Sequence, residues 1–383
     1  MKRTTKIAIA VTVLIAVGGL LAWLAPSGGR ALAFNDLAEA FAKIHSATCT
    51  IRSEAETSQG KMIMRGKSMY LAPARERSEF SPSQVSGPDG STMTASAGIT
   101  ILDYQKGEGI VLSPQTKMAQ VFKLENLPAD RPLSSFQQLR RMVSVAQGDK
   151  TDNAEPLGHQ MIDGRKTVGF RIREGGFEYK IWAEPSTALP VRVEVDSQLK
   201  PASNFVMSDF RFNVELDESL FSLEVPEGYT ANRVKMDASE TTAEDLAQTL
   251  RIVAEHSEGF FPAELLNMED IYRGITKSLI AEHGPGDSRE AQNAVAKAMA
   301  ELGVELGRGI NFILKLTPEH DWHYAGKDVK LNTPNRPIFW YKPIGKEDYQ
   351  VIYADLSVKE VASEELPKVS QPTAEASPAT ATP

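Results

Sequence analysis

Two short polar motifs carry the residue types that could do chemistry. Ser197 and Lys200 have a Ser-x-x-Lys spacing, in which a lysine could activate a serine nucleophile. The run Glu319-His-Asp-Trp-His323 brings His320 and His323 close to two carboxylates, as a zinc site would. The first motif falls in an expected turn without companion motifs, and the second in an expected polar loop. We therefore predict no catalytic residues, no cofactor and no metal, with His320 and His323 as weak metal candidates.

The glycines at 303, 307 and 309 fall inside an expected helix and follow no strand, which argues against a phosphate-binding loop. Gly303 and Gly307 lie four residues apart, on one face of that helix. Small residues at this spacing predict a close contact with a second helix.

Bulk composition narrows the function further. The chain has 383 residues, enough for two domains, with 42% hydrophobic and 24% charged residues. Its net charge of −8 argues against a nucleic-acid partner, which usually needs a basic face. Cys49 is the only cysteine, so an intramolecular disulfide is excluded.

The N-terminus indicates export. Lys2, Arg3 and Lys6 precede an uncharged run from Ile7 to Ala25, which as a helix would reach about 28 Å, close to the hydrocarbon thickness of a bilayer. This predicts a single-pass anchor in the inner (cytoplasmic) membrane, with the N-terminus cytoplasmic and the bulk of the chain periplasmic. Ala31-Leu-Ala33 looks like a processing site, so a cleaved signal peptide is the alternative.

From about residue 34 the pattern predicts one helix and then many strands. Apolar residues recur at helical spacing across 34–45, and then alternate with polar ones as far as about residue 229. One apolar and one charged face, repeated between turn signals, predict an antiparallel sheet with one solvated side. The apolar positions are Cys49, Ile51, Met62, Met64, Val168, Phe170, Ile172, Phe177, Tyr179, Ile181, Val191, Val193, Val195, Phe210 and Phe212. Alternation alone does not distinguish a packed core from a ligand cavity.

The second half of the chain has a different pattern. Helices are predicted over 241–255, 264–282 and 289–316, followed by short strands over 318–361 and a disordered tail rich in Pro, Ala and Thr. The predicted organisation is a membrane segment and linker (1–29), a sheet domain (30–231), a helical region (232–317), a small β module (318–362) and the tail (363–383).

Three stretches resemble the LolA-type periplasmic lipoprotein carriers. They are the opening helix from Phe34 to Ser46, the strand Gly66-Lys-Ser-Met-Tyr-Leu-Ala-Pro73, and the ending Leu216-Asp-Glu-Ser-Leu-Phe-Ser-Leu-Glu-Val-Pro-Glu-Gly-Tyr229, in which 221–225 is predicted to be a strand. The resemblance covers about 34–231. It implies an α+β fold: a half-open antiparallel β-barrel whose apolar face holds acyl chains beneath a helical lid. The C-terminal helices and a small β-meander would be additions to it.

The resemblance also assigns the lid. It would be formed by the opening helix and by a second helix predicted after Ser134 and Ser135. The candidate lid residues are Phe34, Leu37, Phe41, Ile44, Phe136, Leu139 and Met142.

The chain departs from the carriers in two respects. They place an arginine before the strand-ending proline, where it fastens the lid, whereas this chain has Ala72 before Pro73. An anchored protein also could not shuttle between membranes. The related envelope sensor RseB, which has an added domain, fits this layout at least as well.

Two functions follow as hypotheses. The first is a membrane-anchored protein that binds a lipid or the acyl chains of a lipoprotein. The alternative is a regulator of an envelope-stress (sigma-factor) pathway, or a scaffold, in which 232–361 contacts a protein partner. In that case Ile338-Phe-Trp-Tyr341 would be an exposed partner anchor. Neither hypothesis requires an enzyme.

Overall fold

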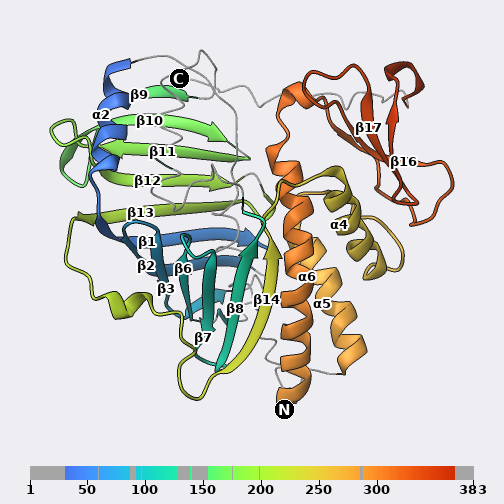
Figure 1. The fold of residues 1–383 in the computed structure, drawn as a ribbon, viewed down its shortest axis with the longest axis horizontal. Coiled ribbons are helices and arrows are strands. Elements are labelled where there is room, and N and C mark those ends of the chain that lie inside the picture. The colour runs from blue at the N-terminus through green and yellow to red at the C-terminus, as the bar shows by residue number, and fades with distance from the viewer. Residues whose placement is uncertain are drawn as a thin grey trace.

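The computed structural model describes residues 31–366, except 59, 87–91, 96, 128–138, 140–153, 175, 198 and 285–287. Helix α2 and a large sheet precede three helices and a small sheet, so the fold is α+β (Figure 1). The expected membrane segment from Ile7 to Ala25 and most of the expected tail lie outside the described residues. Within the described residues, no helix is both long and apolar enough to span a membrane.

The large sheet has 14 strands. Along its main path the order is β14-β8-β7-β6-β3-β2-β1-β13-β12-β11-β10-β9, and β4 and β5 extend it from β2. The direction of the strands turns from β9–β13 to β7, β8 and β14, as the right-handed twist of strands requires (Figure 1). The strands are β1 (Ser46–Thr57), β2 (Gly60–Leu71), β3 (Arg75–Phe80), β4 (Ser83–Ser86), β5 (Thr92–Ala95), β6 (Gly98–Asp103), β7 (Glu108–Ser113), β8 (Met118–Glu125), β9 (Ala154–Ile162), β10 (Arg165–Glu174), β11 (Phe177–Ala183), β12 (Pro190–Ser197), β13 (Ser203–Phe212) and β14 (Thr230–Asp237).

Turn chemistry explains much of this order. Asp163 and Gly164 both have positive φ, 47° and 76°, as the tight turn between two antiparallel strands needs. They join β9 and β10, which pair from Arg165↔Ile162 onward. The two strands therefore form a hairpin that closes at Asp163 and Gly164.

The segment 216–229 differs from its prediction. Residues 218–221 form the short 3-10 helix η1 (Glu218–Phe221), because the Asp217 side chain accepts a hydrogen bond from the Ser219 amide at 2.9 Å. The alternating apolar residues that follow, Leu223 and Val225, pack onto the sheet face that carries Ile101 and Ile110. The predicted strand at 221–225 is thus wrong. The alternating apolar residues belong to the segment 216–229, here called the strap, which lies across the strands and does not join their ladder.

The large sheet extends beyond the predicted boundary at residue 231. After the strap, β14 pairs with β8 over eight residue pairs, from Thr230↔Met118 to Asp237↔Glu125. This pair is parallel, unlike the antiparallel pairs in the rest of the described sheet. Strands β9 to β13 and the segment 213–229 separate β8 from β14 in the chain, and a parallel neighbour needs such a long connection because it cannot be reached through a tight turn.

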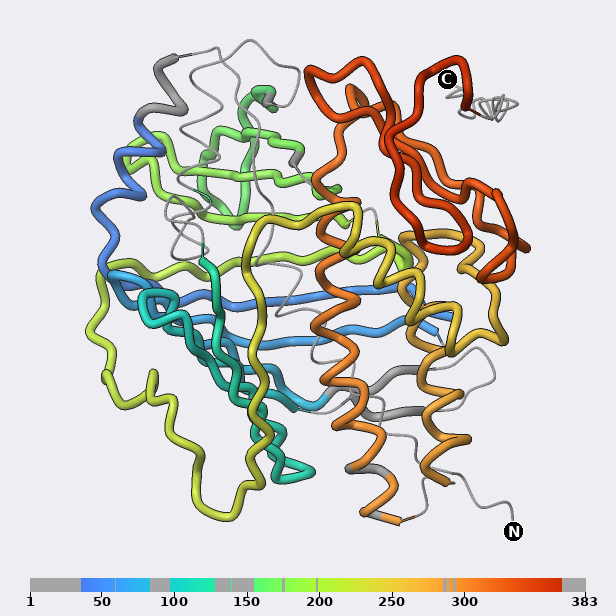
Figure 2. The backbone as a smooth tube through the Cα atoms, turned by 45° about the vertical axis from the view of Figure 1, so that its right-hand side comes forward, coloured from blue at the N-terminus to red at the C-terminus, as the bar shows by residue number. Residues whose placement is uncertain are grey.

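The C-terminal region contains the three predicted helices, α4 (Ala243–Glu255), α5 (Met268–His283) and α6 (Arg289–Lys315). A four-stranded sheet follows, in the order β15 (His323–Tyr324), β16 (Pro337–Tyr341), β17 (Tyr349–Tyr353) and β18 (Val358–Val361). Two further 3-10 helices, η2 (Pro318–His320) and η3 (Ser363–Glu365), flank this sheet. Helices α4 and α6 share a core with it (Figure 2).

The predicted exposed anchor at 338–341 is wrong. Ile338 and Phe339 are fully buried and Trp340 is 3% exposed. Strand β16 is an inner strand of its sheet, and both of its faces are covered. Phe339 packs with α4 and α6, whereas Trp340 packs with Tyr349 and Val351 on the opposite face.

A close helix contact occurs at Gly309, and Gly303 of the predicted pair takes no part in it. A Cβ on Gly309 would overlap the Thr249 side chain of α4 and lie 2.8 Å from the Asp245 carbonyl oxygen, whereas one on Gly303 would meet nothing within 4 Å. The Thr249 hydroxyl also donates to the Glu305 carbonyl at 3.1 Å. Helices α4 and α6 therefore cross at Gly309.

Candidate ligand-binding face

Helix α2 (Ala31–Ala42) covers one face of the large sheet, here called the inner face. Leu37 is fully buried there and Phe41 is 5% exposed. They share a core cluster with Phe170, Ile181 and Val193 of β10, β11 and β12. The opening helix was predicted three residues further along the chain, and its apolar stripe contacts the sheet as the lid hypothesis requires.

The structure brings most of the candidate cavity residues together. One cluster holds nine of them with four lid candidates: Val168, Phe170, Ile172, Tyr179, Ile181, Val193, Val195, Phe210 and Phe212, with Leu37, Phe41, Ile44 and Leu139. Cys49, Ile51 and Met64 are also buried. Cys49 and Ile51 lie on the same side of β1 as Ala47 of the cluster, and Met64 lies on the same side of β2 as Tyr70. Met62 lies opposite Ala55 in the same ladder. All four residues therefore share the inner face.

Two candidates lie elsewhere. Val191 packs with Trp182 and Ile162 on the outer face, because a bulge between Ala183↔Pro190 and Trp182↔Arg192 leaves Val191 unpaired and reverses its direction. Phe177 stands at the end of β11 and packs against the C-terminal helices. The predicted common face is therefore incorrect for Val191. Phe177 stays on the same side of β11 as Tyr179, and the centroids of their rings lie 6.4 Å apart. Phe136, Met142 and the side chain of Phe34 fall outside the described residues.

A second bulge sets the inner face of β13. Asp209 has φ of 54°, and the pairing skips from Thr50↔Ser208 to Thr48↔Arg211. Phe210 and Phe212 consequently face the same side as Met207, although even-numbered and odd-numbered residues of a regular strand face opposite sides. Their rings stack at 5.6 Å between centroids, with 5° between the planes.

Strand β13 carries the most informative part of this face. Phe205, Met207, Phe210 and Phe212, here called the β13 strip, are all only half-buried. Yet β13 is an inner strand, and neighbouring residues on β1 and β12 are fully buried: Ala47 at 1% and Val193 at 0%. Phe205 was not among the predicted inner-face residues. The bulge places 205 and 207 on the same side as 210 and 212, which simple alternation along the strand does not predict.

A row of small polar residues crosses the same face beside the strip. Strand pairing sets Cys49 opposite Ser68, Ser68 opposite Ser78, and Ser78 opposite Thr100. Burial raises the pKa of the Cys49 thiol to about 12, with a smaller contribution from the nearby Glu76 carboxylate. Cys49 is therefore a protonated, buried thiol at neutral pH.

The two arginines after Pro73 contact the strap at 216–229. Arg75 pairs with Glu218 at 3.0 Å, and Arg77 donates to the Leu220 carbonyl at 2.8 Å. Both contacts hold the strap on the outer face. Ala72 packs against the inner cluster, so this position contributes apolar contact there.

The polar motifs have structural partners. His320 Nδ1 accepts a hydrogen bond from the Thr317 amide at 3.0 Å, which closes the start of η2, while His323 Nε2 lies 3.1 Å from Asp321. No group of metal-binding residues is found in the described part of the chain. Ser197 Oγ accepts from the Leu199 amide within a turn.

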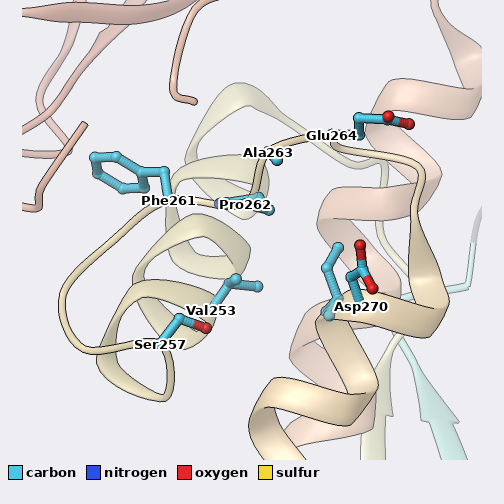
Figure 3. A pocket seen from close by; sticks show the side chains of 8 residues that line it. Val253, Ser257, Phe261, Pro262, Ala263, Glu264 and Asp270 are labelled. Atoms are coloured by element: carbon cyan, nitrogen blue, oxygen red, sulfur yellow. The ribbon is translucent and has the colours of Figure 1, made fainter. Parts of the chain in front are cut away.

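A small cavity in the C-terminal region does not form a second site. It has a volume of about 200 Å³ and is lined by Val253, Phe261 and Ile271, with Glu264 and Asp270 among the polar groups (Figure 3). This is below the roughly 300–1,000 Å³ of typical ligand pockets. Both carboxylates are already paired, Glu264 with Lys200 and Asp270 with Arg273.

Comparison with known proteins gives distant structural likenesses. No protein-family model matches the chain, and no curated protein matches its sequence. Solved structures that resemble it include LprF from Mycobacterium bovis, with 11% identity over 52% of this chain and 96% of that one, at a TM-score of 0.29. A LolA superfamily protein from Nitrosomonas europaea shows 10% identity over 50% and 96%, at 0.25.

The complex of MucA and MucB from Pseudomonas aeruginosa is a third such structure. It shows 16% identity over 50% of this chain and 59% of that one, at a TM-score of 0.28. The classes that the sequence resembles are thus among the structures found. At these TM-scores the likenesses are too distant to assign a function, and we base the function on the described residues.

Proposed function

We propose that this protein is an extracytoplasmic binding protein that holds a lipid, or the acyl chain of a lipoprotein, on the inner face of the large sheet. The observation that carries the proposal is the β13 strip. Four large apolar side chains remain half-buried on an inner strand, next to the fully buried Ala47 of β1 and Val193 of β12. Apolar surface left uncovered in the middle of a sheet face favours an apolar ligand, since its burial is the main driving force available there.

The strip has the dimensions of an acyl chain. From Phe205 to Phe212 it extends roughly 20 Å, at about 3.3 Å per residue. One leaflet of a bilayer has a hydrocarbon depth of roughly 15 Å, half of the full thickness. Each methylene removed from water contributes about 0.8 kcal/mol, so one chain lying along the strip could supply most of the affinity.

In this proposal the sheet is a half-open barrel and α2 is its cover. Leu37 and Phe41 close the inner cluster, so the helix must shift when a chain enters between it and β13. The segment from Ile7 to Ala25 would tether the protein to the inner membrane. Binding requires no catalytic group, and we propose that the protein is not an enzyme.

Matched substitutions on one strand test the proposal. Met207→Asp puts a charge on the inner face, whereas Val206→Asp puts the same charge at a half-buried position of the outer face. Titration with a fluorescent fatty acid should show binding by the wild type and by Val206→Asp, and at least a tenfold loss in Met207→Asp, since about 1.4 kcal/mol is a factor of ten. Equal binding by all three proteins would refute the site.

A further inference from the structure

The helical region, residues 232–317, stands at one end of the strands that form the inner face. Strands β10, β11, β12, β13, β1 and β2 are neighbours in this order. At one end they are joined in pairs by the β10–β11, β12–β13 and β1–β2 turns. Figure 1 shows α4, α5 and α6 at this end of the strands, and α2 across them near the other end.

Hydrogen bonds tie two of these turns to the helical region. In the β12–β13 turn, the Lys200 amide donates to the Leu266 carbonyl, and the Lys200 carbonyl accepts from the Met268 amide, both at 2.8 Å. In the β1–β2 turn, the Ser58 amide donates to Glu269 Oε1, also at 2.8 Å. These bonds fix the start of α5 beside the ends of the strands.

Apolar packing joins the third turn to the helices. A Cβ on Gly176, in the β10–β11 turn, would lie 2.9 Å from the Leu314 side chain of α6. Phe177 and Leu199 pack on the buried core between α4, α5 and α6. The Phe177 ring also lies 6.4 Å from the ring of Tyr179, which packs on the inner cluster. Phe177 therefore connects the inner face with the core of the helical region.

The inner face ends before the helices in one row of residues, here called the end row. Ser197 pairs with Phe177 on one side and with Ser203 on the other. Ser203 in turn pairs with Ala55 of β1. Phe177 is the large side chain among these four residues. Ser203 precedes Phe205 by two residues on the same side of β13, so the β13 strip leads directly to the end row.

The core behind the end row is closely packed. Ile275 and Leu306 are fully buried in it, and Leu314 is 8% exposed. Protein cores have no room for additional methylene groups, and inserting one forces side chains and backbone to move. A chain that lies along the β13 strip therefore meets a barrier at the helical region.

The opposite end of the strip is polar. His45 and Asn213 are exposed beside Phe212, and the His45 amide donates to Asn213 Oδ1 at 3.0 Å. Removing a charged or polar group from water is costly unless it is paired. A bound chain would therefore keep its polar end near Asn213 and place its methyl end at the helical region.

We infer that the helical region closes the acyl site at one end and limits the length of the chain that the protein accepts, with Phe177 as a residue that sets this limit. The inference rests on the proposed function, and it adds the direction of the chain and its maximum length. The strip extends roughly 20 Å, close to the extended length of palmitate. Affinity should rise by roughly fourfold for each methylene until the chain reaches the end row, and should then fall.

Crosslinking and competition test the closed end. The probe is palmitate with a diazirine at its methyl end, added to membranes that contain the full-length chain, and peptide mass spectrometry should locate its crosslinks on 176–181 and 199–205. Palmitate should displace the probe at a concentration at least about tenfold lower than laurate or lignocerate does. Crosslinks confined to the Phe212 end, or lignocerate that competes as well as palmitate, would overturn the inference alone. No crosslink on any strand of the inner face would overturn the proposed function as well.

A bulky residue in the end row should shorten the site. In Ser203→Trp the indole would occupy the end of the strip, so the preference for palmitate over laurate should fall at least about tenfold. Retained displacement by laurate shows that the variant is folded. Ser208→Trp is the matched control, because it puts the same side chain on the outer face of the same strand and should keep the preference of the wild type. An unchanged preference in Ser203→Trp would refute the closed end.

Removing the large side chain of the end row should lengthen the site. In Phe177→Ala, lignocerate should compete at least about tenfold better relative to palmitate than it does in the wild type. Phe260→Ala makes the same change at a position that is 37% exposed, and should have no effect. Ratios measured in the same membranes cancel the partition of each fatty acid into the lipid. The wild-type ratio in Phe177→Ala would overturn the role of Phe177.

Discussion

Arg308 of α6 holds both carboxylate oxygens of Asp245 of α4, with Nε 2.5 Å from Oδ1 and Nη2 2.8 Å from Oδ2. Its Nη1 also donates to the Asp237 carbonyl, at the end of β14, at 2.7 Å. Asp245 raises the pKa of the guanidinium above its usual range. One side chain thus joins two helices of the C-terminal region to the last strand of the large sheet.

Removing this guanidinium should loosen the C-terminal region. Both side chains are 17% exposed, so Arg308→Met leaves the Asp245 carboxylate poorly solvated and should cost about 2–3 kcal/mol of unfolding free energy. Urea unfolding followed by circular dichroism measures the loss. Arg273→Met is the control, because its pair with Asp270 is more than half exposed and should be worth less than about 0.5 kcal/mol. Similar losses in both variants would contradict the role of Arg308.

The contact between α4 and α6 gives a second prediction. Gly309→Ala should destabilise the protein by about 1–3 kcal/mol, since the added methyl group meets Thr249 and the Asp245 carbonyl. Gly303→Ala lies on the same helix in open space, and should stabilise it by about 0.5–1 kcal/mol because alanine is the better helix former. Thermal unfolding of the two variants should therefore shift in opposite directions. A shift in the same direction would show that the helices do not approach at Gly309.

Charge on the outer face gives a prediction for acid stability. Burial alone would raise the pKa of Asp196, but hydrogen bonds from Asn204 and Lys180 outweigh it and lower the pKa below the usual value. A lowered pKa in the folded state contributes stability above the unfolded pKa, about 3.9, and that stability is lost as the pH falls through the folded value. Asp196→Asn should therefore cost up to about 1 kcal/mol at pH 7, discounted because the side chain is 41% exposed, and nothing at about pH 2.

The measurement is the urea midpoint at several pH values. Glu56→Gln is the matched control, since that carboxylate is 74% exposed and 4.0 Å from Lys61. It should have little effect at any pH. A loss in Asp196→Asn that persists unchanged at the lowest pH would show that its origin is not ionic.

Alternation in the sequence predicted the sheet and most of its inner face, because a strand with one buried side must repeat with period two. The alternation assigned Val191 to the wrong face, because this residue is unpaired in a bulge and its side chain points to the outer face. It also missed Phe205, because the bulge at Asp209 changes which positions of β13 face inward. Both errors arise from bulges, whose position depends on the neighbouring strand. The residue pattern of a single strand does not contain that information.

Other differences have a tertiary origin. The segment 221–225 has the composition of a strand, yet it packs across β6 and β7 through Phe221 and Leu223. The run 338–341 is apolar whether it is exposed or buried, and only the positions of α4 and α6 decide between the two. Likewise Gly309 is indistinguishable from Gly303 in sequence, because the helix that crosses it lies some 60 residues away.

The central claim is that the inner face holds an acyl chain, and native mass spectrometry of the full-length chain tests it most directly. Wild type, Met207→Asp and Val206→Asp would be released from membranes in the same detergent, and the lipids that co-purify would be extracted and identified. The proposed function predicts a stoichiometric acyl-containing ligand on the wild type and on Val206→Asp, and its loss from Met207→Asp. The same lipid content in all three proteins, or none in any of them, would contradict it.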